Sequence, residues 1–298
     1  MNNFSGKSIL VTGASSGIGR AISIHLAKEG YIVLATIRKE TNAESLDKLG
    51  LSTLKPMFPL DLTRQEDIRS MAVSVKGMVK NHAIPPLFAI INVAGGGQIA
   101  PIELMDILNF RDELEKRLVG PVSLLQELLP LLRETRGRVL WISTPGLFPV
   151  PFVADIHAPD FAVNYLARTL NLELRPDGIK NILIRCGGIN TQSPLRTETK
   201  LAEMLKSWPA DKLDIYKDRL LKLQQNLGHF SSKRTDPEKV ANLISKVLNT
   251  RNPRVRYQIG HMSGLGALLE KLPQSWVDFI MGKREGEDDP DKALNSIK

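Results

Sequence analysis

Short apolar runs alternate with helical patterns along most of the chain. The segments between the runs carry apolar residues spaced three and four apart, which is typical of helices that cover a sheet. Seven strands are predicted, at residues 8–11, 32–36, 54–60, 87–93, 138–143, 182–186 and 255–260. Helices are predicted at residues 18–28, 68–80, 111–133, 161–174 and 237–248. This order predicts an α/β protein with a doubly wound parallel sheet.

Two segments depart from the alternation. Residues 191–232 are lysine-rich and helical, without a strand, and they follow the carboxyl end of a predicted strand. Such an insertion commonly covers a ligand crevice, so a lid is predicted at about residues 192–235. A last helix, rich in Leu, Trp, Phe and Ile, is predicted at about residues 265–281. Without a repeat or linker, residues 1–284 are expected to form one domain, followed by a disordered tail at residues 285–298.

Composition narrows the class of protein. The formal charge is +8, from 40 basic and 32 acidic residues, but the basic residues are scattered without interleaved aromatics. A nucleic-acid partner is therefore not expected. No apolar run reaches the roughly 18 residues of a membrane span, and the first residues do not form a secretory signal. The single cysteine, Cys186, suits a reducing compartment such as the cytoplasm. No metal-ligand motif is predicted.

A glycine-rich loop joins the first predicted strand to the first helix. Gly13 permits a tight turn, Gly17 lets the backbone approach a pyrophosphate, and Gly19 allows the helix to pack closely. The free N–H groups of the helix N-terminus suit an anion. This strand–loop–helix context predicts a Rossmann fold with a dinucleotide site.

The end of the second strand favours NADP(H) over NAD. An acid there would bind the ribose 2′-hydroxyl of NAD, but the sequence offers no acid and two cations, Arg38 and Lys39. An arginine makes a bidentate contact with a 2′-phosphate.

With these motifs, the chain resembles the short-chain dehydrogenase/reductase family from residue 7 to about residue 283. The family's TGxxxGIG pattern is unchanged here, its NNAG appears as Asn-Val-Ala-Gly with Val93, and its PGxxxT appears with Cys186 in place of proline. The resemblance implies that the adenine lies against Asp61 and that residues 187–191 contact the nicotinamide carboxamide. The cofactor-binding residues expected from the motifs and the resemblance are Gly13, Ser15, Gly17, Ile18, Gly19, Arg38, Asp61, Asn92, Ala94, Gly95, Ile189 and Thr191.

The residues that carry hydride chemistry in the family are largely replaced. The family uses a serine, a tyrosine, a lysine four residues later and an asparagine; the lysine lowers the tyrosine pKa. Ser143 matches the serine, but the tyrosine position falls on Ile156, the lysine position on Asp160 and the asparagine position on Arg117. Isoleucine cannot donate a proton.

Two interpretations of Asp160 remain open. Proline is favoured in the first turn of a helix, so the helix is expected to begin near Pro159, where the helix dipole favours an acid at Asp160. Alternatively, Arg117 and Asp160 form a buried ion pair across the old catalytic site. His157 is the nearby group that titrates near neutrality, and it is expected to be a solvent-facing loop residue rather than a catalytic one. Ser143, Arg117, Asp160 and His157 are the candidate catalytic residues.

Residues 193–232 and the ending 254–273 resemble the steroid and retinoid branch of the family. This resemblance implies a lipophilic small-molecule ligand. It also makes a membrane surface a candidate partner through Leu265, Leu268, Trp276 and other apolar residues of the last helix, although packing within the protein explains them equally well. The family commonly forms dimers or tetramers through its long helices, so a homo-oligomer is expected.

Three functions remain open. The protein is a non-catalytic NADP(H) binder, a redirected catalyst such as an isomerase, a cyclase or a reductase whose proton comes from substrate or water, or a conventional NADP-dependent oxidoreductase whose acid lies elsewhere. The missing tyrosine favours the first two. The sequence does not choose between them.

Overall fold

Seven short apolar segments form one parallel sheet in the computed structural model, which describes residues 6–231 and 233–285. The strands lie in the order β3-β2-β1-β4-β5-β6-β7. Their bounds are β1 Ser8–Val11, β2 Ile32–Thr36, β3 Leu54–Met57, β4 Leu87–Asn92, β5 Arg138–Ser143, β6 Lys180–Cys186 and β7 Arg256–Ile259. The predicted doubly wound parallel sheet is therefore confirmed.

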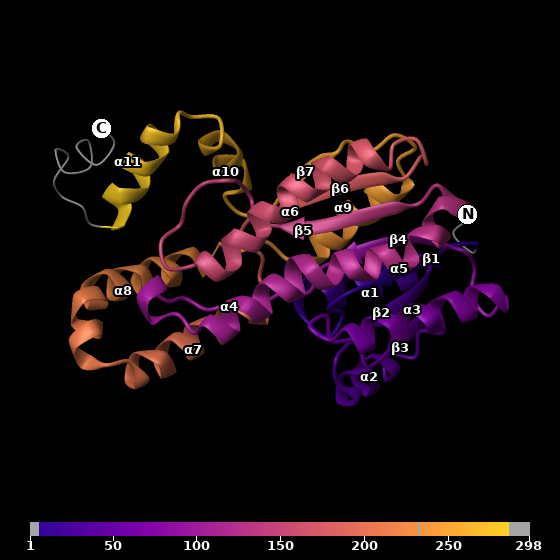
Figure 1. Ribbon diagram of the computed structural model, residues 1–298, viewed down its shortest axis with the longest axis horizontal. Helices are drawn as coiled ribbons and strands as arrows, with labels where there is room; N and C mark the ends of the chain where they lie inside the picture. Colours follow the sequence, from indigo (N-terminus) through magenta and orange to yellow (C-terminus); the bar gives the residue numbers. More distant parts are fainter. Residues whose placement is uncertain (1–5, 232, 286–298) are drawn as a thin grey trace.

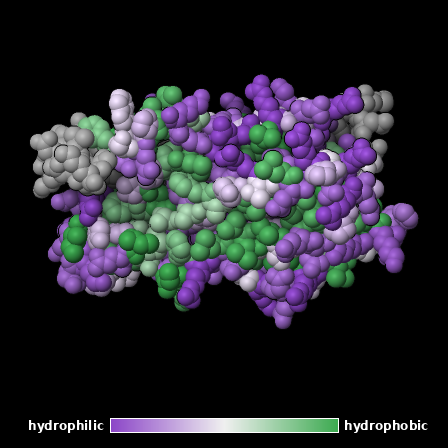
Figure 2. Space-filling view, turned by 45° about the horizontal axis from the view of Figure 1, so that its top comes forward, coloured by the Kyte–Doolittle hydropathy of each residue, from purple (hydrophilic) through white to green (hydrophobic). Residues whose placement is uncertain are grey.

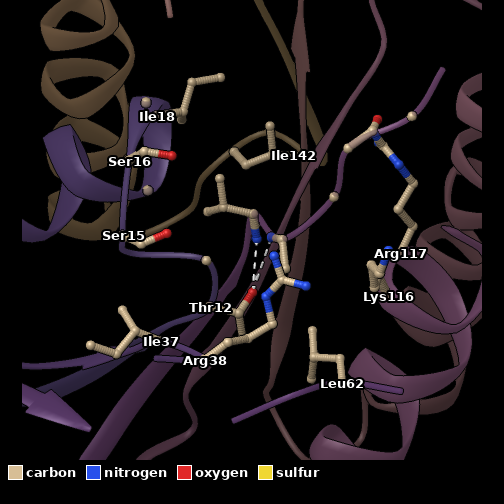
Figure 3. Close-up of a pocket in the computed structure, with 18 of the residues that line it drawn as sticks. Thr12, Ser15, Ser16, Ile18, Ile37, Arg38, Leu62, Lys116, Arg117 and Ile142 are labelled. Carbon is tan, nitrogen blue, oxygen red and sulfur yellow. Dashed lines mark hydrogen bonds between the residues drawn. The ribbon is translucent and has the colours of Figure 1, made fainter. Parts of the chain in front are cut away.

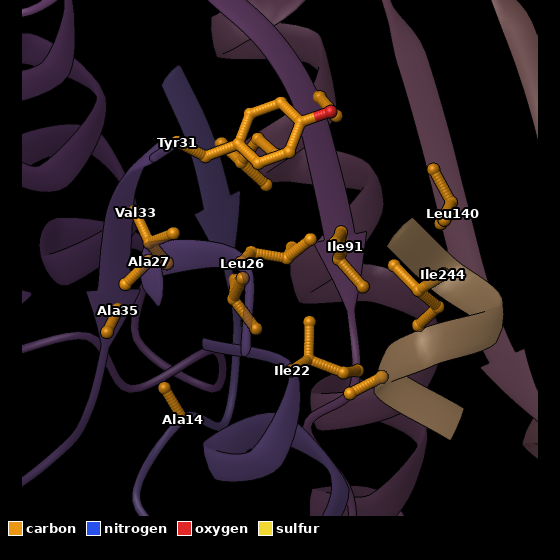
Figure 4. Packing of buried hydrophobic residues seen from close by; sticks show 14 of the residues in the cluster. Ala14, Ile22, Leu26, Ala27, Tyr31, Val33, Ala35, Ile91, Leu140 and Ile244 are labelled. Atoms are coloured by element: carbon orange, nitrogen blue, oxygen red, sulfur yellow. The ribbon is translucent and has the colours of Figure 1, made fainter. Parts of the chain in front are cut away.

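The central strands are buried on both sides, because helices cover both faces of the sheet. One layer holds α1 (Gly17–Lys28), α2 (Glu40–Asp47) and α9 (Pro237–Asn249), and Figure 4 shows Ile22 and Leu26 of α1 packed beside Ile91 and Ile244. The opposite layer holds α3 (Gln65–Lys80), α5 (Gly120–Thr135) and α6 (Ala154–Glu173).

The lysine-rich insertion forms two helices, α7 (Gln192–Ser207) and α8 (Ala210–Ser231), at the end of the molecule on the left of Figure 1. Their apolar side chains pack on one another and on the segment after β4, in a cluster with Ile99, Leu201, Leu220 and Leu223. Leu201, Leu220 and Leu223 of the lid are therefore buried in a small core beneath it.

Two long helices of the sequence prediction are interrupted. The helix predicted at residues 111–133 is α4 (Ile107–Leu114), a π-helical turn (Glu115–Val119) and then α5. The helix predicted at residues 265–281 is α10 (Ser263–Leu269) and α11 (Gln274–Glu285), separated at Pro273, whose ring cannot continue a helix. Residues 286–298, predicted as a disordered tail, lie outside the described residues.

The prediction that α6 begins near Pro159 is wrong. The helix begins at Ala154, and Pro159 lies inside it, where its missing N–H leaves the carbonyl of Asp155 without its helical partner. The third strand also ends at Met57, three residues before its predicted end, and the sequence prediction missed α2.

Candidate functional site

A cleft of about 830 Å³ opens at the carboxyl ends of the central strands. It is lined by the loop after β1, the end of β2, the segment after β4, the π-helical turn, the end of β5 and the first turns of α6. Figure 3 shows Ser15 and Ser16 on one side of the cleft and Lys116 and Arg117 on the other. In an open α/β sheet this edge is where ligands bind.

The glycine loop holds the shape that a bound pyrophosphate requires. Gly13 has a φ of +66°, and a Cβ at that position would lie 2.9 Å from the Cα of Ala94. Thr12 joins the two segments, because its hydroxyl oxygen accepts from the N–H groups of Val93 (3.0 Å) and Ala94 (3.3 Å), as the dashed lines of Figure 3 show. Ser16 precedes α1 without a side-chain capping bond, so the first N–H groups of the helix face the cleft.

Two cations line the end of the cleft that β2 forms. Arg38 and Lys39, at the end of β2, both line it, and Figure 3 shows Arg38 reaching across the cleft. Asp61 lies beside them. Burial opposes its ionisation, but hydrogen bonds from Thr63 and the charges of Arg38 and Lys116 outweigh burial and lower its pKa. The two cations and the carboxylate together fit an adenosine that carries a phosphate.

The π-helical turn directs two consecutive cations into the cleft. A π turn places one more residue in each turn than an α-helix does, so neighbouring side chains diverge less. Lys116 and Arg117 therefore both line the cleft. Lys116 also lies 3.1 Å from the carboxylate of Glu113.

Arg117 and Asp160 form the predicted ion pair. Nη1 of Arg117 donates to Oδ1 of Asp160 at 2.9 Å, Nε donates to Glu113 at 3.1 Å, and Nη2 donates to the carbonyl oxygen of Gly96 at 2.6 Å. The other carboxylate oxygen of Asp160 accepts from the N–H of Thr144 at 2.9 Å. Burial lowers the pKa of Arg117, but the charges of Asp160 and Glu113 outweigh burial and raise it. The site therefore holds a closed ionic network.

Ile156 fills the position that the resemblance assigns to tyrosine. Its side chain packs on Gly97, where an added Cβ would lie 2.1 Å from Cγ1 of Ile156. Ile156 lines the cleft beside Ser143. A hydrocarbon side chain thus stands at the position that the resemblance assigns to the tyrosine acid.

Ser143 is held from behind by two buried side chains that sequence reasoning missed. Its hydroxyl oxygen accepts from Nδ2 of Asn164 at 2.7 Å, and Oδ1 of Asn164 accepts from Nε of Arg185 at 2.8 Å. Arg185 also pairs with Glu270 of the C-terminal segment. These residues lie far apart in sequence, so no local motif indicates their contact.

His157 and Asp155 flank Ile156 behind the cleft. The expectation of a solvent-facing loop histidine is wrong: His157 lies in α6, with its ring centroid 5.8 Å from that of Phe161 and 6.4 Å from that of Phe148. Burial lowers its pKa, with the charge of Asp160 opposing. Asp155 is 1% exposed and accepts from the N–H of Gln98 at 2.8 Å. Neither side chain lines the cleft.

The remaining predicted cofactor residues divide into two groups. Those that line the cleft are Gly13, Ser15, Gly17, Ile18, Gly19, Arg38, Asp61, Ala94, Gly95 and Thr191. Asn92 and Ile189 are instead buried behind it, and both amide atoms of Asn92 lack a hydrogen-bond partner within the described chain. Cys186 also lines the cleft, and burial raises its pKa to about 12, so it stays a thiol.

The described residues offer neither a metal cluster nor a membrane-spanning helix. No three His, Cys, Asp or Glu side chains gather as metal ligands there. None of the described helices is long and apolar enough to cross a membrane.

Comparison with known proteins identifies relatives along nearly the whole chain. The family model for short chain dehydrogenases matches residues 7–201. Mouse short-chain dehydrogenase/reductase family 9C member 7 is 29% identical, covering 95% of this chain and 91% of its own. Human 11-beta-hydroxysteroid dehydrogenase type 2 is 29% identical, covering 87% of this chain and 65% of its own. A short chain dehydrogenase from Burkholderia cenocepacia in complex with NADP has a TM-score of 0.68 and 18% identity, covering 94% of this chain and 99% of its own.

Proposed function

Because the chain belongs to the short-chain dehydrogenase family, in its steroid dehydrogenase branch, we propose that it binds NADP(H) and a small lipophilic molecule without the family's tyrosine–lysine proton relay. The observation that carries this proposal is the pairing of Arg117 with Asp160 at 2.9 Å beside Ile156. The protein is proposed to work in the cytoplasm, free or at the surface of a membrane.

The residues of the cleft fit the cofactor. The glycine loop and the first turn of α1 would hold the pyrophosphate, Arg38 would hold the 2′-phosphate, and Asp61 would lie at the adenine. Solved relatives that contain NADP support this choice of cofactor. When bound, NADPH supplies a hydride.

The residues at the positions that the resemblance assigns to tyrosine and lysine supply no proton to accompany a hydride. Ile156 has no ionisable group, and the side chain of Asp160 accepts hydrogen bonds from Arg117 and from the N–H of Thr144. An anion at this position would also raise, rather than lower, the pKa of any phenol beside it. The cleft therefore favours binding over conventional reduction.

A redirected reaction is the second candidate function. Ser143 still lines the cleft as a hydrogen-bonding group, and the cation Lys116 lines it as well. These groups suit a reaction in which negative charge develops on a substrate oxygen, such as an isomerisation or cyclisation.

Cofactor binding is tested by NADPH fluorescence titration of the full chain. We expect Arg38→Ala to weaken NADPH binding by about 10-fold, with little effect on NADH, because it removes a charge-assisted contact with the 2′-phosphate. Arg64→Ala is the matched control, since Arg64 is 63% exposed and does not line the cleft. Equal loss of NADPH and NADH binding would contradict the assignment of Arg38.

Turnover is tested with NADPH and a panel of lipophilic ketones. We expect no steady NADPH consumption, or a slow one that depends on Arg117 and Asp160. Steady consumption that is lost in Ser143→Ala, but unchanged by replacing His157 or Asp160, would instead establish conventional reductase chemistry.

A further inference from the structure

The hydrogen-bond direction at Ser143 is fixed by a buried arginine. Arg185 of β6 is 2% exposed, and its guanidinium can only donate hydrogen bonds. It faces the side-chain amide of Asn164, with Nε at 2.8 Å from Oδ1, and its other end pairs with Glu270. The amide atom that faces Arg185 must therefore be the oxygen.

This constraint orients the other end of the amide. With Oδ1 turned to Arg185, the Nδ2 group of Asn164 points to the opposite side. There it donates to the carbonyl oxygen of Asp160 at 2.8 Å and to the hydroxyl oxygen of Ser143 at 2.7 Å. Asn164 is 2% exposed, so water does not compete for these bonds. Ser143 is thus an acceptor toward the protein interior.

The hydroxyl proton of Ser143 must then point elsewhere. The nearest acceptor within the described protein is the carbonyl oxygen of Asp160, at 3.5 Å, well beyond the 2.5–3.0 Å typical of a hydroxyl donor. The carboxylate of Asp160 is already bonded to Arg117 and Thr144, and Ile156 offers no acceptor. The proton is therefore available to the cleft, which Ser143 lines.

We infer that Arg185, acting through Asn164, fixes Ser143 as a hydrogen-bond donor to the cleft, so that the site favours ligands presenting a carbonyl oxygen there over the matching alcohols. An alcohol oxygen can also accept the serine proton, but the proton of the alcohol then needs an acceptor of its own, and Ile156 beside Ser143 offers none. The inference rests on the proposed function, in that a small molecule binds beside the nicotinamide. Asn164 and Arg185 are positioning residues, since neither lines the cleft.

The first test measures the hydrogen bonds without a ligand. In ¹⁵N-labelled full-length protein, the side-chain amide signal of Asn164 is identified by its loss in Asn164→Asp. We expect Ser143→Ala to move one of its two proton signals, because one amide proton loses its acceptor. Arg185→Lys should leave these signals nearly in place, because lysine also can only donate. An Asn164 amide that does not respond to Ser143→Ala would overturn the inference.

The second test compares a ketone with its alcohol. Estrone and estradiol are titrated against protein loaded with tetrahydro-NADP, which has no hydride to transfer, and binding is followed by calorimetry. We expect estrone to bind about 5-fold more tightly, the equivalent of one ordinary hydrogen bond. Asn164→Asp should abolish or reverse this preference, because a carboxylate beside Arg185 accepts the serine proton, while Arg185→Lys should preserve it.

The outcomes separate this inference from the proposed function. Loss of NADPH binding in the unaltered protein would contradict the proposed function itself. Intact NADPH binding with no preference for estrone, or with an unchanged preference in Asn164→Asp, would overturn the donor assignment alone. Intact NADPH binding with neither steroid bound would contradict the lipophilic ligand of the proposed function, and the amide signals of Asn164 would then decide the donor assignment.

Discussion

Asp155 is a buried carboxyl whose two oxygens are only partly satisfied by hydrogen bonds. It accepts one hydrogen bond from the N–H of Gln98, while its other oxygen has no partner within the described chain. Burial raises its pKa to about 6, with the charge of Glu113 adding to the shift and that of Arg117 opposing it. The folded state therefore binds a proton at Asp155 more tightly than the unfolded state does.

This shift predicts that the contribution of Asp155 to stability falls as the pH rises from about 4 to above 6. Over that range Asp155 binds fewer protons in the unfolded state than in the folded state, so its contribution to the free energy of unfolding falls with pH. We expect Asp155→Asn to remove much of this slope and to raise stability at pH 8 by about 1–2 kcal/mol, since an unpaired amide costs less than a buried charge. Urea unfolding of both proteins at pH 5 and pH 8 measures this difference in the free energy of unfolding.

The control for this prediction is Asp218→Asn, which changes an exposed carboxyl on the lid. It should leave the pH dependence of unfolding unchanged. A pH slope that persists in Asp155→Asn would show that another group carries it.

At the residue scale, the sequence predicted which residues stand at the expected catalytic positions, but it did not predict which side chains contact them. Counting on from Ser143 assigned Ile156 and Asp160, and with Arg117 these residues line the cleft. The opposite charges of Arg117 and Asp160 suggested their pairing, which the structure contains. Glu113, Lys116, Asn164 and Arg185 were missed, because their roles depend on which faces of separate elements meet. The roles proposed for all of these residues stay predictions.

At the scale of elements, strands were predicted better than helix ends. A buried parallel strand is a continuous apolar run, so β2 and β5 match their predictions residue for residue. Helix ends depend on caps and on tertiary packing, as the early start of α6 and the π-helical turn show. Proline misled the prediction for α6, since packing holds the helix around Pro159 despite the lost hydrogen bond.

The position of Pro159 predicts a stabilising substitution. Pro159→Ala would restore the N–H that bonds to the carbonyl of Asp155 and would remove the clash of the ring with the preceding turn. We expect the free energy of unfolding to increase by about 1 kcal/mol or more. Chemical denaturation measures the change.

Pro237→Ala is the matched control, because Pro237 is the first residue of α9, where proline costs nothing. It should leave stability unchanged or slightly lower. Equal effects of the two substitutions would show that Pro159 does not strain α6.

At the scale of the whole molecule, two of the segments that keep exposed apolar side chains suggest partners. On α10 and α11 the exposed residues are Leu265, Leu268, Trp276 and Ile280. On α6 they are Tyr165 and Leu172, at 73% and 74% exposure. Figure 2 shows apolar side chains gathered across the middle of one face of the molecule. The two segments suit two different partners.

We propose that the C-terminal segment binds anionic membrane surfaces. Its exposed apolar residues lie near Lys271, a combination typical of interfacial binding. In flotation with vesicles containing phosphatidylserine, we expect Leu268→Glu with Trp276→Ala to reduce the bound fraction about 10-fold. Tyr165→Glu, which alters the other segment, is the control and should float like the unaltered protein.

We propose that α6 contributes to a homodimer. Tyr165 and Leu172 are seven residues apart and therefore share one face of the helix. Tyr165→Glu with Leu172→Glu should convert the dimer to a monomer in analytical ultracentrifugation, whereas Leu268→Glu should not. A monomer in the unaltered protein would contradict this proposal.

The Arg117–Asp160 pair ties the residue at each of its two positions to the other. Asp160→Lys alone would place two cations side by side, and Arg117→Asn alone would leave Asp160 as a buried anion without its cation. Breaking a buried pair from one side costs about 3–5 kcal/mol, a large share of a typical domain's stability. We therefore expect Asp160→Lys to be tolerated only together with a substitution of Arg117.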